Sequence, residues 1–425
     1  MKKKLLLYIL IVLFLLAAAI AIYNYIQFRS HYDLITHTFS VEDKFISHKK
    51  FQGCYCENII YNGWVYYAPF RIWEWGNDYL PLDLERAKSR SLLTRRNIDS
   101  GEIQYFDFGS EKTKNSEFVG LAADGRGYVY LVALEQNIVL RIKVDDKCFG
   151  DSKIEEFKLD VSSGYSGSLL VYDNYLYITF GSRKEAIRID TLNFCHAGVE
   201  FLNVRKLDAD AGGYAGICVD KKGFIWMAPS YNGGYYTGKI VRIDSSNFTL
   251  EGTSIIDLAK LNPNARGYHG VCYYDNYVYF VPHVNETGPH SLLAVVDINK
   301  PNLEGTRIID VAKYNDAAKG FINCEVVGKY IWMFPYAYNN SNQNLITVLD
   351  TRNNSFFHLD IAKYIPDAQL MFYDGSYDGK YMYLSPHKML YVDGKEYWDC
   401  RALVLDAGSI RKNFKYMKFT EFINR

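Results

Sequence analysis

Four histidines in the C-terminal half of the chain could form one chemical site. They are His269, His283, His290 and His387. Imidazole serves as a general acid, a general base or a metal ligand near neutral pH. A zinc or manganese site needs three or four ligands that converge at about 2.0–2.2 Å, and none of these histidines has a local metal-binding spacing such as HxH or HExxH. We therefore expect no metal and no cofactor, and we assign no catalytic residue.

Aromatic side chains in polar segments form a second group with chemical potential. Flat rings stack on the apolar faces of sugars or peptides, while nearby Asn, Asp and Arg satisfy polar groups. For any single ring, packing of one loop against another is the competing interpretation. The candidate ligand-binding residues combine these aromatics with three histidines: Trp73, Trp75, Tyr214, Tyr235, Tyr236, Tyr268, His269, His283, Tyr338, His387 and Trp398. No GxSxG elbow, phosphate-binding loop or dinucleotide fingerprint stands in a suitable context.

These candidates lie around seven copies of one strand pattern. Each copy alternates aromatic or β-branched residues with period two, which is typical of a strand and not of a helix. The copies are Trp64–Pro69, Tyr128–Ala133, Tyr175–Phe180, Phe224–Pro229, Tyr277–Pro282, Tyr330–Pro335 and Tyr381–Pro386. Their starts are 64, 47, 49, 53, 53 and 51 residues apart. A period near fifty indicates a repeat architecture.

Each repeat has the same internal order of strands and turns. Asn-Gly, Asp-Gly or Asp-Asn precedes the aromatic strand in most repeats, which predicts a hairpin. The third strand ends in an Asp, and we expect that Asp to cap a turn. A fourth strand follows; in the last repeat it is expected at Phe414–Phe419, with Ile35–Phe39 as an alternative outer strand. Seven four-stranded antiparallel units predict an all-β, seven-bladed β-propeller over residues 51–425.

The repeats resemble the broad superfamily of propeller-repeat proteins from about Gly53 to Phe422. The segments closest to surface-protein propellers are Tyr377–Pro386 and Gly238–Asp244. The recurring Gly-His and Trp-Asp pairs of WD repeats are absent, as are the regular diglycines of kelch repeats. The resemblance implies a fold and no substrate.

The first strand of several repeats opens on a glycine-bounded motif. It stands at Gly164–Gly167, Gly213–Gly216 and Gly267–Gly270, and it departs from the pattern at Gly320–Asn323. Glycine lets the innermost strand enter the crowded axis of a propeller. The position before the second glycine varies, and His269 is the sharpest site candidate there.

Long connections cluster in five of the repeats. In a propeller, the loops that join strands two and three gather on one face, around the mouth of the central channel, so we expect the site there. The long connections are Phe70–Ser91, Ser230–Gly238, His283–Ser291, Tyr336–Asn344 and His387–Asp399.

The N-terminus predicts attachment to a membrane. Three lysines at positions 2–4 precede an uncharged apolar run from Leu5 to Ile22, which as a helix is about 27 Å long, close to the hydrocarbon thickness. We expect residues 1–28 to form a transmembrane helix with a cytoplasmic N-terminus, residues 29–50 a stalk, and the propeller to lie outside the cytoplasm. Cleavage near the small residues at positions 17–21 is the alternative, and the protein would then be secreted.

Composition narrows the classes of partner. Lys+Arg and Asp+Glu are equal at 48 each, and no basic stripe stands out, so we expect no nucleic-acid partner. Cys218, Cys272 and Cys324 share one strand position and are expected in the core. A Cys148–Cys195 disulfide is possible in adjacent blades, and so is a disulfide from Cys400 to Cys54 or Cys56.

The sequence thus favours a membrane-anchored binding or scaffold module for a glycan or a cell-surface protein. The alternative is a carbohydrate-active enzyme, similar to a polysaccharide lyase, with a histidine-containing site at the channel mouth. A structural part of an envelope complex without a small ligand is a third hypothesis.

Overall fold

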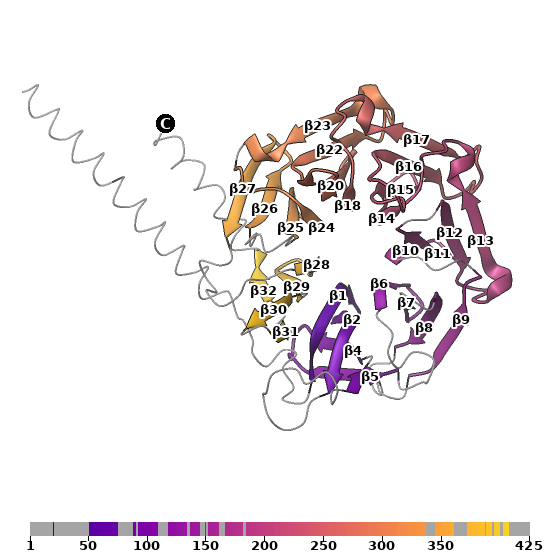
Figure 1. Cartoon of the computed structure of the whole chain (residues 1–425). Coiled ribbons are helices and arrows are strands. Elements are labelled where there is room, and N and C mark those ends of the chain that lie inside the picture. Colours follow the sequence, from indigo (N-terminus) through magenta and orange to yellow (C-terminus); the bar gives the residue numbers. More distant parts are fainter. Residues whose placement is uncertain are drawn as a thin grey trace, which may run out of the picture.

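Seven antiparallel sheets stand around one central axis, each with its first strand innermost (Figure 1). Closure into a ring protects strand edges that an open sheet would expose. The chain is an all-β, seven-bladed propeller, as the period near fifty residues predicts. The computed structural model describes residue 20 and residues 51–74, 88–90, 92–108, 118–133, 137–144, 149, 152–160, 166–181, 184–313, 315–336, 345–360, 372–386, 388–392, 395–399 and 403–407.

The first three blades follow the chain from residue 51. Blade 1 consists of β1 (Phe51–Tyr61), β2 (Trp64–Glu74), β4 (Leu92–Asn97) and β5 (Ile103–Asp107), with β3 (Lys88–Arg90) also paired to β2. Blade 2 consists of β6 (Phe118–Ala123), β7 (Tyr128–Ala133), β8 (Ile138–Lys143) and β9 (Ile154–Lys158). Blade 3 consists of β10 (Ser166–Tyr172), β11 (Tyr175–Phe180), β12 (Glu185–Asp190) and β13 (Val199–Asn203), with η2 (His196–Gly198) before β13.

The next three blades repeat this order. Blade 4 consists of β14 (Tyr214–Val219), β15 (Phe224–Pro229), β16 (Lys239–Asp244) and β17 (Thr253–Asp257). Blade 5 consists of β18 (Tyr268–Tyr274), β19 (Tyr277–Pro282), β22 (Leu292–Asp297) and β23 (Thr306–Asp310), with the hairpin β20 (Val284–Asn285) and β21 (Gly288–Pro289). Blade 6 consists of β24 (Phe321–Val327), β25 (Tyr330–Pro335), β26 (Leu345–Asp350) and β27 (Ser355–Asp360). Short 3-10 helices are η3 (Val204–Lys206), η4 (Leu258–Lys260), η5 (Leu303–Gly305) and η6 (Val311–Lys313).

Blade 7 has three strands in the part of the chain that the structure describes. They are β28 (Phe372–Tyr377), β29 (Tyr381–Pro386) and β32 (Leu403–Asp406), with the hairpin β30 (Lys388–Val392) and β31 (Lys395–Asp399) between the last two. Both segments expected to supply its outer strand, Phe414–Phe419 and Ile35–Phe39, lie outside the described residues. So do the predicted membrane segment, apart from Ile20, and the stalk. Within the described residues, no helix is long and apolar enough to span a bilayer.

The turns have the backbone that their sequences predict. Asn62 (φ 50°), Gly63 (φ 75°), Asp173 (φ 53°) and Asp275 (φ 57°) lie in the left-handed region, which Gly, Asn and Asp tolerate best. At the ends of the third strands, Asp190, Asp244, Asp297 and Asp350 each accept a hydrogen bond from the backbone N–H two residues further on, at 2.8, 2.9, 2.8 and 3.1 Å. The repeated Asp is therefore a turn cap, as predicted.

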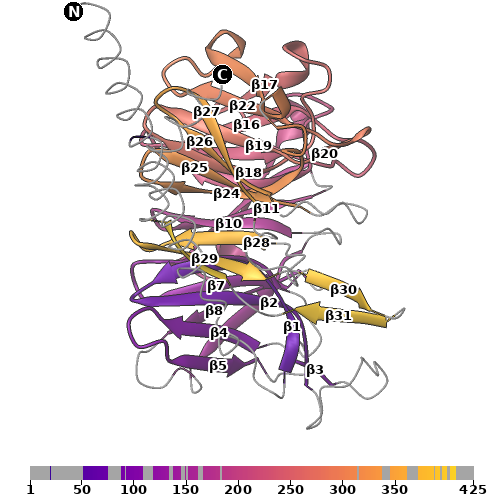
Figure 2. The same cartoon turned by 90° about the vertical axis from the view of Figure 1, so that its left-hand side faces the viewer.

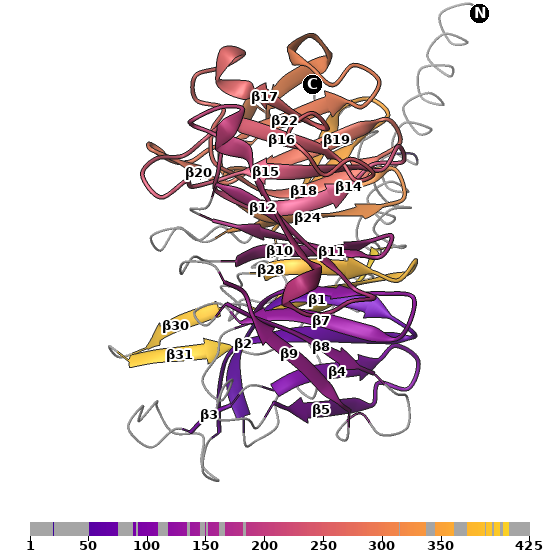
Figure 3. The same ribbon diagram turned by 90° about the vertical axis from the view of Figure 1, so that its right-hand side faces the viewer.

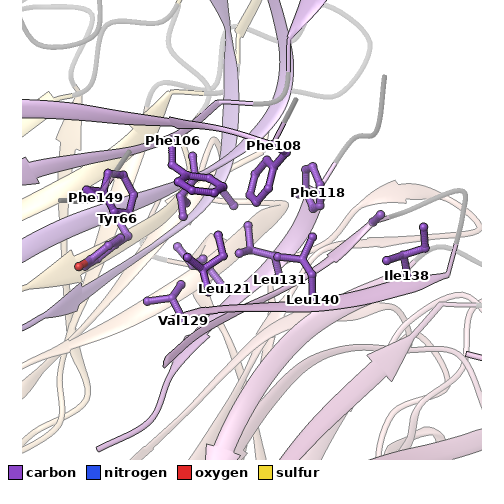
Figure 4. Close-up of a cluster of buried hydrophobic side chains, with 14 of the residues drawn as sticks. Tyr66, Phe106, Phe108, Phe118, Leu121, Val129, Leu131, Ile138, Leu140 and Phe149 are labelled. Carbon is purple, nitrogen blue, oxygen red and sulfur yellow. The ribbon is translucent and has the colours of Figure 1, made fainter. Parts of the chain in front are cut away.

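The core lies between neighbouring blades. Figure 4 shows this between blades 1 and 2, where Phe106 and Phe108 of one blade meet Phe118 and Leu131 of the next. The rings of Phe108 and Phe118 stack with centroids 4.7 Å apart. Burial of such rings is the main source of stability in a fold whose blades share few backbone hydrogen bonds.

Arginines of the third strands add polar ties between blades. Arg188 lies over the Tyr175 ring of its own blade at 4.1 Å and donates from Nη1 to the Ser245 carbonyl of the next blade at 2.9 Å. Arg141 repeats the arrangement one blade earlier, with a 2.6 Å bond to the Thr191 carbonyl. Each guanidinium thus joins two blades while its flat face remains stacked on a ring.

The cysteines are mainly core residues. Cys272 and Cys324 are buried free thiols in one hydrophobic cluster, as the shared strand position predicts. Cys195 is an exposed free thiol, so the predicted bridge to Cys148 is wrong. Cys56 is buried and forms no disulfide, so the alternative bridge from Cys400 to Cys56 is wrong. Cys400 and the Cys54 side chain lie outside the described residues, so a bridge between these two stays a prediction.

Candidate functional site

One face of the ring carries the long connections. The hairpins β20–β21 and β30–β31 and the strand β3 project from the same side of the propeller (Figures 2 and 3). We call this side the loop face; it holds the connections between second and third strands and those from one blade to the next. The prediction that long connections gather on one face is confirmed for these segments. In blade 7, the long connection His387–Asp399 contains the hairpin β30–β31.

A tyrosine loop in blade 4 presents rings to solvent on the loop face. Tyr231 is 43% and Tyr235 is 38% exposed. The Tyr231 ring packs edge-on against Tyr236 at 5.3 Å, and the buried Asn232 accepts hydrogen bonds from the N–H groups of Gly234 and Tyr235. The rings are therefore held by the loop and are exposed at the same time.

Acidic groups surround the same loop. The Tyr235 hydroxyl donates to Asp210 at 2.8 Å, and the Tyr236 N–H donates to Glu286 at 3.1 Å. These carboxylates come from the two neighbouring connections, so blades 3, 4 and 5 meet at the tyrosine loop. The structure thus brings Tyr235 and Tyr236 together on the loop face.

Exposed apolar side chains are concentrated at this place. Apart from Ile20, the described residues include six large hydrophobic side chains that are exposed. Four of them lie on the loop face of blades 3 to 5: Leu207, Tyr231, Tyr235 and Leu261. We call these four residues the apolar patch. The other two, Leu192 and Phe201, belong to the opposite turn and the rim of blade 3.

Two predicted histidines meet at the loop-face end of β18 and β19. The His283 ring lies 5.2 Å from the His269 ring and 4.4 Å from the Tyr336 ring. Burial lowers the pKa of His269 to about 4 and that of His283 well below its usual 6.5, with His269 and His290 adding to the effect on His283. Both imidazoles are therefore neutral at physiological pH. Both ring nitrogens of His283 are buried, and within the described chain neither has a hydrogen-bond partner.

The remaining predicted residues have different surroundings. Tyr214 and Tyr268 are fully buried, and the Tyr268 ring packs edge-on against His290 at 5.3 Å. Trp73 is in β2 and Trp398 in β31, with side chains outside the described residues, where Trp75, Tyr338 and His387 also lie. Ligand contact by any of these residues stays a prediction. Among the described residues, no three His, Cys, Asp or Glu side chains are placed to hold a metal ion.

Sequence reasoning missed a carboxyl cluster on the innermost strands. Burial raises the pKa of Glu57 to about 8, of Glu325 to about 8 and of Asp374 to about 7, and the Asp374 charge adds to the effect on both glutamates. Glu57 accepts hydrogen bonds from the Leu121 N–H at 2.9 Å and the Ser168 hydroxyl at 3.0 Å. Its carboxyl therefore links blades 1, 2 and 3.

A departure from glycine marks this cluster in the sequence. The residue two positions after the inner-strand aromatic is Gly270 in blade 5, but it is Asn323, Asp374 and Glu57 in blades 6, 7 and 1. The Asn323 amide donates to Asp374 at 2.8 Å. The sequence already shows the departure at Gly320–Asn323. Comparing the equivalent position in blades 7 and 1 identifies Asp374 and Glu57.

Comparison with known proteins identifies the fold and nothing finer. No family model and no curated protein matches the sequence. A catalytically inactive His-to-Ala variant of virginiamycin B lyase from Staphylococcus aureus, solved with quinupristin, matches with a TM-score of 0.58 at 14% identity, over 84% of this chain and 96% of that one. This chain shares the fold of propeller proteins. A streptogramin B lyase structure gives a TM-score of 0.55 at 12% identity, over 85% and 95% of the two chains.

An extracellular domain also has this fold. The extracellular domain of a proposed one-component system from B. thetaiotaomicron matches with a TM-score of 0.54 at 10% identity, over 82% of this chain and 41% of that one. At sequence identities of 10–14%, the similarity to these structures shows a shared propeller fold and nothing about activity. The neighbours include a lyase and the extracellular domain of a proposed one-component system, so the propeller shape alone selects no activity.

Proposed function

We propose that this protein is a membrane-anchored binding module whose loop face holds a partner outside the cytoplasm. The apolar patch is the observation that carries the proposal. Exposed apolar side chains that cluster on one face favour an interaction site, whereas single exposed residues need no explanation. The hydrogen bonds around Asn232 and Asp210 fix the tyrosines in advance, which lowers the entropy lost on binding.

A protein is the partner that the patch favours. Leu207 and Leu261 are aliphatic and exposed, and they offer dispersion contacts without the flat surface that sugar rings stack on. Tyrosine is enriched at the centres of protein interfaces, where its ring is buried and its hydroxyl remains bonded. The Tyr235 hydroxyl already has such a bond to Asp210.

A glycan is the second candidate. Tyr231 and Tyr235 could stack on a sugar ring, and Asp210 and Glu286 lie beside them as acceptors for hydroxyl groups. A glycan array and a display library of extracytoplasmic protein domains separate the two candidates. Loss of binding in the Tyr231→Ser/Tyr235→Ser double variant would support the loop face as the binding site. Whether the wild type binds a protein domain or a glycan decides between the two candidates.

A matched control is available in the same protein. Leu192 is 65% exposed but lies on the opposite turn of blade 3, so Leu192→Ser removes an exposed apolar side chain without touching the loop face. Equal loss of binding in Leu192→Ser and the double tyrosine variant would contradict the proposal. So would the absence of any bound protein domain or glycan in both screens.

The proposed location rests on the N-terminal sequence. The apolar run from Leu5 to Ile22 after three lysines supports an anchor with its N-terminus in the cytoplasm. In intact cells, added protease should digest the propeller while the membrane fraction retains the N-terminus. A propeller protected from protease in intact cells would contradict this orientation.

A lyase-like enzyme remains the alternative, and the histidine pair favours it. A neutral imidazole is a proton acceptor, and His283 has both ring nitrogens without a protein partner in the described chain. Two fold neighbours are lyases, which is a likeness of fold alone. Turnover of a polysaccharide panel that is lost in His283→Ala and retained in Leu192→Ser would favour the enzyme over the binding module.

A further inference from the structure

Three connections between blades on the loop face have one construction. They run over residues 204–213, 258–267 and 311–320, from the end of a fourth strand to the start of the next blade. Each begins with a short 3-10 helix, η3, η4 or η6, whose first residue is fully buried: Val204, Leu258 and Val311. Each also buries an alanine seven residues later: Ala211, Ala265 and Ala318. Two anchors therefore fix every connection to the core.

Side-chain caps hold the backbone between these anchors. At the entrance, Asn203, Asp257 and Asp310 accept hydrogen bonds from the backbone N–H two residues on, at 3.1, 3.1 and 3.2 Å. In the middle, Asp208, Asn262 and Asn315 do the same, each at 3.0 Å. Such caps satisfy turn N–H groups that would otherwise bind water. Three equal turns are thus held rigidly at equivalent places on successive blades.

Two of these turns carry a lysine followed by an exposed leucine. The pairs are Lys206-Leu207 and Lys260-Leu261, with both leucines exposed at 44% and 42%. Lys313 is exposed in the third turn and precedes Tyr314, and the sequence repeats the pattern at Lys363-Tyr364; both tyrosines lie outside the described residues. We call Lys206-Leu207 and Lys260-Leu261, together with Lys313, the tips.

Packing within the chain does not account for the tips. Burial in the core explains the apolar residues at the two anchors. It does not explain the two leucines, because their side chains are exposed to water. The lysines are exposed as well. The nearby acids Asp208 and Asp257 form their ion pairs with Lys239, at 2.5 and 3.5 Å, and Lys260 adds only a weaker charge attraction to Asp208. Over the three connections, arginine and lysine outnumber aspartate six to three, although the whole chain is neutral. The tips are thus both apolar and basic.

We propose that the tips bind an acidic segment of the partner protein, in which carboxylates flank apolar side chains. Leucine contacts supply affinity through the removal of apolar surface from water, and the lysines select the sign of charge and speed the encounter. Repetition on successive blades lets one extended partner engage several tips, so that each added contact is intramolecular. This inference rests on the proposed function, because it names the partner of the same loop face.

The probe is a set of soluble peptides that share one apolar pattern of Leu and Phe and differ only in charge. One series carries Glu and Asp, one Lys and Arg, and one Ser and Gln; phosphatidylglycerol vesicles are a fourth probe. Peptide binding to the full-length protein in detergent is measured by fluorescence anisotropy. Vesicle binding is measured by flotation, with the full-length protein held in detergent-free phosphatidylcholine nanodiscs. We expect the acidic series to bind, and its affinity to fall as salt rises.

Two double variants and one control separate the contributions. Leu207→Ser/Leu261→Ser should weaken acidic-peptide binding about tenfold or more, because it removes both apolar side chains that the peptide would shield from water. Lys206→Glu/Lys260→Glu should shift the preference toward the basic series. Leu192→Ser should leave binding unchanged. All exchanged side chains are exposed, so equal unfolding temperatures establish that the variants are folded.

Several results would overturn the inference. One is that both double variants still bind the acidic peptides. A second is that the three peptide series bind equally well. A third is that the protein binds anionic vesicles but not the acidic peptides. If peptide binding is lost in Tyr231→Ser/Tyr235→Ser but unchanged in the tip variants, the tips do not bind the partner, and the proposed function still holds. Binding that none of the loop-face variants affects overturns both.

Discussion

The backbone N–H of Asn58 donates to Oδ2 of Asp374 at 3.2 Å, although 316 residues separate them. Asn58 lies on β1 and Asp374 on β28, so this bond joins the innermost strands of the first and last blades. The Asn58 amide also donates to the Tyr383 carbonyl at 2.9 Å and to the Ser385 hydroxyl at 2.8 Å, and the Ser376 hydroxyl donates to the Asn58 carbonyl at 2.9 Å. Polar groups near the axis therefore contribute to the closure of the ring.

Removal of the Asn58 amide should weaken this closure. In Asn58→Ala, the Tyr383 carbonyl and the Ser385 hydroxyl lose a donor in a buried place, since Asn58 is 2% exposed. We expect the free energy of unfolding to fall by about 2–4 kcal/mol, because each buried group left without a partner costs about 1–3 kcal/mol. Denaturant unfolding followed by tryptophan fluorescence measures the change. Asn264→Ala, at an exposed asparagine, is the control, and an equal effect in both variants would contradict this role.

The inner-strand carboxyls should make stability depend on pH above neutrality. Their folded pKa values of about 8 for Glu57 and Glu325 and about 7 for Asp374 exceed the usual 4.5, 4.5 and 3.8. Between these values the folded state binds more protons than the unfolded state, so stability decreases as pH rises. Below pH 6.5, His269, His290 and His358 act in the opposite direction, because burial lowers each pKa to about 4.

The carboxyl contribution is therefore isolated between pH 6.5 and 8.5. We expect the wild type to lose about 3–5 kcal/mol of unfolding free energy over this interval in urea titrations. Glu325→Gln should lose less over the same interval, whatever its stability at pH 6.5, because it removes one of the titrating groups. A wild-type stability that is flat or rises from pH 6.5 to 8.5 would show that these carboxyls are ionised in the folded protein.

The glycines of the inner strands should tolerate no side chain. A Cβ at Gly270 would lie 2.6 Å from Cα and 2.8 Å from Oδ1 of Asn323 in the next blade. Gly270→Ala should destabilise the protein by about 1–3 kcal/mol, since overpacking forces backbone shifts. Gly125→Ala is the matched control, because nothing lies within 4 Å of its added carbon and its φ is not positive. Thermal unfolding of both variants tests this, and equal melting temperatures would mean that the inner strands can move apart.

Local chemistry was enough to predict the blades. Tyr277–Pro282 and its six relatives alternate with period two and follow turn residues such as Asp275, and the structure has strands at those positions. The fold could be predicted because the same pattern of strands and turns recurs in every blade. The hairpin β30–β31 was not predicted, although Asp393-Gly394 between its strands is a turn signal, because it lies outside the four-strand pattern that the other blades repeat.

The site was only partly predictable. His269 and His283 were expected near each other from their places at the loop-face ends of β18 and β19, and their rings lie 5.2 Å apart. Glu57 and Asp374 each replace a glycine of the repeat, which the sequence shows, but it does not show that they form one cluster. Their hydrogen-bond partners are far away along the chain: Leu121 and Ser168 for Glu57, Asn58 and Asn323 for Asp374. The exposure of Leu207 and Leu261 depends on how the connections fold, which no periodicity reveals.

If the loop face of blades 3 to 5 binds a partner, removal of its exposed tyrosines should weaken that binding. The partner domain or glycan recovered from the two screens is titrated against the full-length wild type, Tyr231→Ser/Tyr235→Ser, and the control Leu192→Ser/Phe201→Ser. We expect an affinity at least about tenfold lower for the tyrosine variant and no change for the control. Equal affinities for all three proteins would contradict it.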